Sequence, residues 1–87
     1  MTDKKRELLS IAQTETMLFY QCIHPDILVN DLAAVLRWVE EDPAAVLRCV
    51  KIMGHQYGIT AYTGSFAEAA HYSYRGTVSA LEALVNA

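Results

Sequence analysis

The sequence predicts an all-α fold, a compact bundle of about four helices that forms one domain over residues 1–87. Apolar residues recur every three to four positions through most of the chain, which is the spacing of one helix face. The segment AAVLRWV at 33–39 is echoed by AAVLRCV at 44–50, and both copies are rich in helix-forming residues. Start and stop signals divide the chain into expected helices at approximately 3–23, 26–41, 43–57 and 65–85.

The two echoed segments are separated by the acidic sequence Glu40-Glu41-Asp42 and by Pro43. Proline removes a backbone donor and disfavours helical geometry at the preceding residue, so one straight helix over both copies is disfavoured. Asp42 is a good N-cap, and Pro43 suits the first position of a helix. The expected structure is therefore two helices that meet at an acidic corner, with a sharply kinked single helix as the alternative.

The first helix is expected from Asp3 to about Ile23, with an apolar face made of Leu8, Ile11, Ala12, Leu18, Phe19, Cys22 and Ile23. His24-Pro25-Asp26 follows and resembles the His-Pro-Asp signature of J-domain co-chaperones, a resemblance that implies a loop contacting a chaperone partner. That family has a basic helix before the signature, whereas residues 14–23 contain no lysine or arginine. A turn in which Pro25 opens the second helix explains the same tripeptide.

The last helix begins with Ser65-Phe66-Ala67-Glu68, the pattern of a capping box. Small residues then repeat along one side of it, namely Ala69, Ser73, Gly76, Ala80 and Ala83. Such a row lets another helix approach closely, which compensates the cost of Gly76, up to ~1 kcal/mol against alanine. The neighbour is either a helix of the same chain or the same helix of a second copy. Because chains of this size are often stabilised by oligomerisation, a homodimer is expected.

Composition and charge argue against several classes of function. The net charge of −3 indicates neither a basic nucleic-acid surface nor a densely acidic nucleic-acid mimic. Two cysteines are too few for a disulfide framework, and residues 1–7 lack the apolar run of a signal peptide, so a reducing cytoplasm is expected. No apolar run approaches the ~20 residues that cross a bilayer, so no membrane partner is expected.

Chemistry-bearing motifs are weak in this sequence. Cysteine and histidine side chains suggest a metal site built from Cys22, His24, Cys49, His55 or His71, but their spacing is not that of a recognised zinc site. The sequence has no Gly-rich phosphate loop, no nucleophile elbow and no His-Glu-x-x-His. We therefore expect no enzyme activity, no cofactor and no metal.

Two surfaces are candidates for contact with a partner. One combines Ile27 and Trp38, on the margin of the second helix, with the corner residues Glu40, Glu41 and Asp42. The other is a basic row, Arg48, Lys51 and His55, on the third helix. We expect a small regulator or inhibitor that docks on and occludes a larger protein, a type common among phage- and plasmid-borne proteins. The alternatives are a helix-turn-helix-like nucleic-acid reader, which the acidic corner opposes, and a small-ligand or metal-binding protein with a pocket near Tyr57, Tyr62, His71 and Tyr74.

Overall fold

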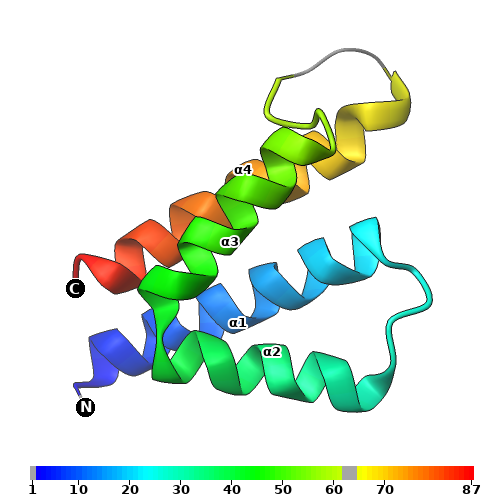
Figure 1. Cartoon of the computed structure of the whole chain (residues 1–87). Coiled ribbons are helices and arrows are strands. Elements are labelled where there is room, and N and C mark those ends of the chain that lie inside the picture. The colour runs from blue at the N-terminus through cyan, green and yellow to red at the C-terminus, as the bar shows by residue number, and fades with distance from the viewer. Residues whose placement is uncertain (1, 62–64) are drawn as a thin grey trace.

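The computed structural model describes residues 2–61 and 65–87, apart from the side chains of residues 65–67. Four helices account for most of these residues: α1 (Asp3–Ile23), α2 (Val29–Glu41), α3 (Pro43–Gln56) and α4 (Ser65–Val85). The described residues include no strand. The predicted all-helical, four-helix fold is therefore confirmed (Figure 1).

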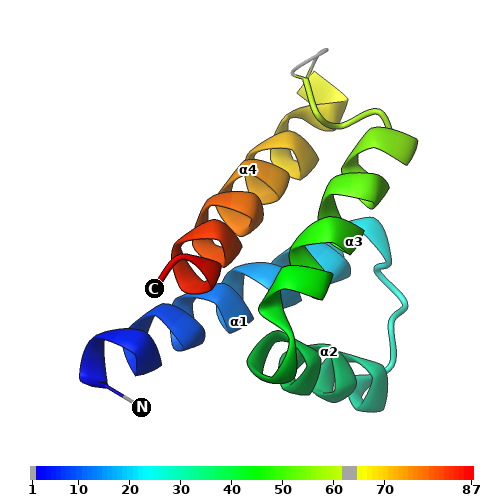
Figure 2. The ribbon, with the colours of Figure 1, turned by 60° about the vertical axis from the view of Figure 1, so that its left-hand side comes forward.

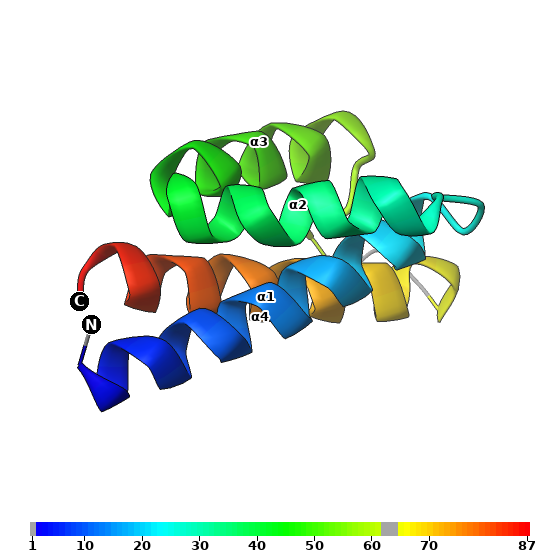
Figure 3. The ribbon, with the colours of Figure 1, turned by 90° about the horizontal axis from the view of Figure 1, so that it is seen from below.

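Each helix runs antiparallel to the one before it in the chain (Figure 1). Seen from below, α1 and α4 form one layer, and α2 and α3 form a second layer over it (Figure 3). The most extensive packing joins α1 to α4, followed by α3 to α4 and α1 to α2. Among the helix pairs that are in contact, α2 and α3 have the least, and they diverge from their shared corner (Figure 2). This corner and both ends of the chain lie at the same end of the bundle (Figures 1 and 3).

All four helices contribute to one apolar core. Its fully buried large side chains include Phe19 from α1, Val39 from α2, Val46 and Val50 from α3, and Leu81 from α4. Burying each such side chain stabilises the fold by roughly 1.5–3 kcal/mol relative to leaving it exposed. Val39 and Val46 lie on either side of the corner, so the core itself holds the corner in place.

The buried face of α1 differs from the predicted one. Its buried residues are Leu9, Ala12, Thr16 and Phe19, whereas Ile11 and Leu18 are 46% and 50% exposed. Cys22 is exposed as well. The prediction is confirmed for Ala12 and Phe19 and wrong for Ile11, Leu18 and Cys22, because the buried face includes the polar Thr16, which apolar spacing does not mark. The face is rotated toward α4, where the equally buried Thr77 lies.

The α1–α2 connection also differs from its prediction, because α2 begins at Val29 and not near residue 26. The Ile27 amide donates a hydrogen bond of 3.0 Å to the His24 carbonyl, so Pro25 occupies a turn and does not open a helix. Leu28 is the N-cap of α2 and provides no side-chain cap. At the α3–α4 connection, Gly58 has the positive φ of 68° that suits a helix stop. The predicted capping box depends on the Ser65 side chain, which lies outside the described residues.

The α2–α3 corner has the predicted construction. Asp42 is the N-cap of α3, and its Oδ1 atom accepts a hydrogen bond of 3.2 Å from the Ala45 amide. Pro43 occupies the first position of α3. The alternative of a single kinked helix is wrong, because Asp42 leaves helical geometry with φ −150° and ψ 72°.

Candidate functional site

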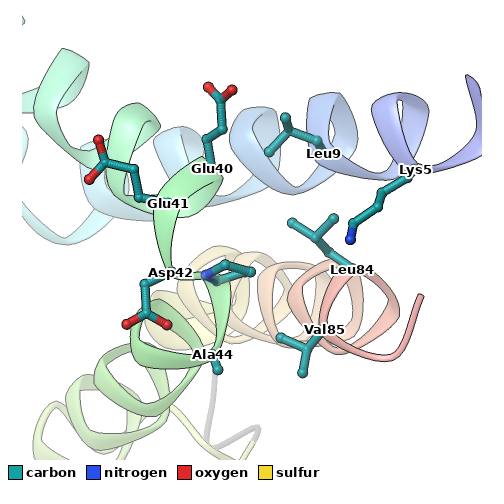
Figure 4. Close-up of a pocket in the computed structure, with 9 residues that line it drawn as sticks. Lys5, Leu9, Glu40, Glu41, Asp42, Ala44, Leu84 and Val85 are labelled. Atoms are coloured by element: carbon teal, nitrogen blue, oxygen red, sulfur yellow. The ribbon is translucent and has the colours of Figure 1, made fainter. Parts of the chain in front are cut away.

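A cavity of about 350 Å³ lies at the end of the bundle that contains the α2–α3 corner (Figure 4). Three parts of the chain form its walls: the first turns of α1, the corner, and the last turn of α4. The residues that line it are Lys5, Leu9, Glu40, Glu41, Asp42, Pro43, Ala44, Leu84 and Val85. The predicted acidic corner therefore borders a hollow, which we call the corner pocket.

Part of the lining of the corner pocket is apolar. Leu9 and Leu84 are only 9% and 5% exposed, and both belong to the core of the bundle. Val85 lies at the edge and is 41% exposed. Pro43 and Ala44 are half-buried at the start of α3, where the Asp42 cap fixes the backbone. The pocket is therefore an open hollow whose lining is partly apolar and partly polar.

Acidic residues outnumber basic ones among the residues that line the corner pocket. Glu40, Glu41 and Asp42 are all exposed, and Lys5 is the cation among the lining residues. Figure 4 shows the glutamates directing their carboxylates outward from the corner, while Lys5 extends from α1 toward Leu84. The described residues contain one ion pair, between Arg6 and Asp3 at 3.9 Å, and it involves none of the lining residues.

Helix ends of both polarities meet at the corner pocket. The last turns of α2 and α4 contribute to its lining, and their carbonyl ends carry partial negative charge. The first turns of α1 and α3 line it too, and their amide ends carry partial positive charge. The helix dipoles therefore oppose one another at this pocket.

The other predicted partner residues lie outside the corner pocket. Trp38 is half-buried and packs against the apolar core, and Ile27 is half-buried beside the α1–α2 turn. Arg48, Lys51 and His55 are all exposed along α3. The structure thus brings only Glu40, Glu41 and Asp42 to a hollow, and partner binding by any of these residues remains a prediction.

Part of the small-residue row of α4 already packs against other residues of the same chain. A Cβ atom on Gly76 would lie 2.8 Å from the Glu15 Oε2 atom of α1, and Ala80 packs against the core. Ser73 is half-buried, whereas Ala69 and Ala83 are exposed. The inner part of the row therefore faces α1, and a dimer contact through its outer members remains a prediction.

The remaining candidate residues do not form a cluster. Cys22 and Cys49 are both free, and the described residues include no group of three or more histidine, cysteine or acidic side chains placed to hold a metal. The Nδ1 atom of the buried His71 lies 3.0 Å from the Ile59 carbonyl oxygen, a contact that ties α4 to the segment after α3. The Tyr74 ring lies against Gly54 and the Phe19 ring, while Tyr62 lies outside the described residues.

Sequence reasoning missed Lys5, Leu9, Leu84 and Val85 as parts of the site. They come from opposite ends of the chain and meet only because α1 and α4 are antiparallel neighbours. No local motif indicates this meeting.

No protein-family model matches this chain, and comparisons with curated proteins and with solved structures found no similar one. None of the helices in the described ranges is both long and apolar enough to span a membrane. The feature of the described residues that points to a function is therefore the corner pocket with its charged surroundings.

Proposed function

We propose that this chain is a non-enzymatic protein-binding module, a small regulator or inhibitor that docks the rim of its corner pocket on a larger protein and occludes that protein's surface. The observation that supports the proposal is that a partly apolar hollow of about 350 Å³ lies beside three exposed carboxylates. Such a hollow suits partner recognition, since a partner side chain can fill it while the nearby charges select the partner. We further propose that it acts in a reducing cytoplasm, with both cysteines as free thiols.

The corner is favoured over the basic row of α3 for a geometric reason. Arg48, Lys51 and His55 are separately exposed side chains, and none of them lines the corner pocket. Exposed charges by themselves contribute little binding energy, about 0.2–1 kcal/mol for each pair. A partner group that enters a hollow is also removed from water, and this adds to the binding energy that charges provide.

An affinity capture from the native host tests the proposal. The immobilised chain is compared with a corner variant, Glu40→Lys/Glu41→Lys, and with a row variant, Arg48→Glu/Lys51→Glu, and the bound proteins are identified by mass spectrometry. We expect one protein to be retained by the wild type and by the row variant and lost by the corner variant, with circular dichroism showing that all three chains are folded. Loss only from the row variant, or equal retention by all three, would reject the corner as the docking surface.

We also propose that the chain forms a homodimer through the outer part of α4, where Ala69 and Ala83 are exposed. Light scattering at tens of micromolar should give twice the 9.7 kDa chain mass. A monomer mass at that concentration would reject the dimer without affecting the corner proposal, because the two surfaces do not share residues.

A further inference from the structure

We propose that the outer side of the layer formed by α1 and α4 binds a second copy of this chain, with α1 of each copy packed on α4 of the other. This inference rests on the homodimer proposed above, and it adds the contribution of α1 and the arrangement of the two chains. Its basis is a pair of large apolar side chains on α1 that are level with groups of small residues on α4.

The large side chains are those of Ile11 and Leu18, which are 46% and 50% exposed. They are seven residues apart and therefore share one side of α1. The Gln13 Nε2 atom donates a hydrogen bond of 3.0 Å to the Leu36 carbonyl oxygen, so the Gln13 side of α1 faces the layer of α2 and α3. Ile11 lies ~200° around the helix from Gln13. Its side of α1 therefore faces away from that layer, where none of the four helices covers it (Figure 3).

Small residues occupy the corresponding side of α4. The Tyr74 ring packs against Gly54 of α3, so the Tyr74 side of α4 faces the other layer. Gly76 is ~200° around the helix from Tyr74 and therefore lies on the outer side. Four residues at positions i, i+3, i+4 and i+7 of a helix surround a hole that can accept a side chain of a facing helix. The outer side of α4 has two such holes, one formed by Gly76, Ser79, Ala80 and Ala83, and one by Ala69, Tyr72, Ser73 and Gly76.

The large side chains and the holes are at matching heights along the bundle. The Thr77 hydroxyl donates a hydrogen bond of 2.9 Å to the Glu15 carbonyl oxygen, and a Cβ atom on Gly76 would lie 2.8 Å from the Glu15 Oε2 atom. Glu15 is therefore level with Gly76, and its carboxylate is turned onto its own chain. Because α1 and α4 are antiparallel and rise equally per residue, Ile11 is level with the first hole and Leu18 with the second (Figure 1).

This arrangement makes the outer side of the layer complementary to itself. A two-fold axis that runs along the helices places α1 of one copy over α4 of the other, antiparallel to it and at the same height. Ile11 then enters the hole of the second copy that contains Ala83, and Leu18 enters the hole that contains Ala69. The two copies together form a layer of four helices on the knobs-into-holes pattern of helix bundles.

The size of this surface meets the requirement of a stable dimer. Both α1 and α4 have 21 residues. Two such helices side by side are about 30 Å long and about 20 Å wide, which gives about 600 Å² for each copy. The total of about 1,200 Å² reaches the lower limit of specific, stable interfaces, which bury about 1,200–2,000 Å².

Sedimentation equilibrium of the full chain tests the surface. Ile11→Glu/Leu18→Glu places charges on the large side chains' positions and should raise the dimer dissociation constant at least about tenfold, since a charge that is buried without a partner is costly. Ala69→Lys/Ala83→Lys fills both holes from two exposed positions and should have the same effect. The matched control is Ile52→Glu, at an apolar residue of α3 that is 56% exposed, and it should leave the constant unchanged. Circular dichroism verifies that each variant is folded.

An equimolar mixture of the two double variants tests the arrangement of α1 on α4. In a mixed dimer the introduced glutamates of one chain face the introduced lysines of the other, and the unchanged rows of both chains face each other at the second contact. We expect the mixture to form dimers at a concentration at which each variant alone is monomeric. A mixture that stays monomeric would overturn the arrangement.

A wild-type dimer that both double variants retain, or that Ile52→Glu loses equally, would overturn this surface and leave the homodimer to another one. A monomeric wild type would overturn both this inference and the proposed homodimer. Neither result concerns the corner pocket, whose docking role fails only if the corner variant retains its partner in the affinity capture.

Discussion

The hydroxyl of Thr77 on α4 donates a hydrogen bond of 2.9 Å to the backbone carbonyl of Glu15 on α1. Thr77 is completely buried, and so is Thr16, the residue that follows Glu15. The two threonines therefore place polar atoms inside the most extensive helix contact of the bundle. Their hydroxyls differ in one respect, because the Thr16 Oγ1 atom has no hydrogen-bond partner among the described residues.

Replacing each of these threonines with valine should change the free energy of unfolding in opposite directions. Thr77→Val loses a buried hydrogen bond and should lower the free energy of unfolding by about 1 kcal/mol. Thr16→Val removes a buried unsatisfied hydroxyl at nearly constant shape and should raise the free energy of unfolding by up to about 1 kcal/mol. Urea denaturation of both variants measures the difference, and two changes of the same sign would contradict this account of the α1–α4 contact.

Alanine substitutions at two helical glycines should also change the stability of the fold in opposite directions. A Cβ atom on Gly54 would overlap the Tyr74 ring, which packs against Phe19, so Gly54→Ala should destabilise the fold by about 1–3 kcal/mol. At Gly76 the nearest atom is the end of the flexible Glu15 side chain, so Gly76→Ala should stabilise the fold by about 0.5–1 kcal/mol. Thermal unfolding checks both variants.

Tyr74→Ala provides the control for the Gly54 contact. In that background Gly54→Ala should no longer be destabilising, because the overlapping ring is absent. An unchanged penalty would show that the Gly54 backbone, and not its contact with Tyr74, explains the effect.

The corner depends on the Asp42 cap as well as on packing. Asp42→Ala loses the hydrogen bond to the Ala45 amide and should lower the free energy of unfolding by about 1 kcal/mol. Asp42→Asn keeps a capping oxygen and should lose less stability. Partner capture by Asp42→Asn then reports the role of the charge alone, whereas equal destabilisation by both variants would argue against the cap.

Stability should fall in alkali partly because of Tyr20. Burial is the main cause that raises the pKa of this phenol, and the nearby Cys49 is the second. The folded chain therefore holds the proton more tightly than the unfolded chain, so this group causes no pH dependence well below pH ~10 and lowers the stability as the pH rises through that value. Urea denaturation at pH ~8 and pH ~10.5 should show a smaller loss for Tyr20→Phe than for the wild type. Identical losses would contradict the assignment to Tyr20.

Sequence reasoning predicted the helices well where local chemistry decides them, as at Asp42-Pro43 and Gly58. It failed where tertiary packing decides, because nothing local distinguishes a buried Thr16 from a polar interruption or an exposed Ile11 from a core residue. The same limit applies to the candidate site. The acidic corner can be recognised in the sequence. That it lies close to Lys5, Leu9 and Leu84 follows only from the packing of α1 against α4.

The most direct test of partner binding is chemical-shift mapping by NMR on the isotope-labelled chain, titrated with the protein identified by affinity capture. Even as a dimer of 9.7 kDa chains, the free protein is small enough for this measurement. We predict that the largest perturbations fall on the residues around the corner pocket, namely Lys5, Leu9, Glu40 to Ala44, Leu84 and Val85. Perturbations centred on Arg48, Lys51 and His55, or spread evenly over the chain, would contradict the claim that the corner pocket is the docking site.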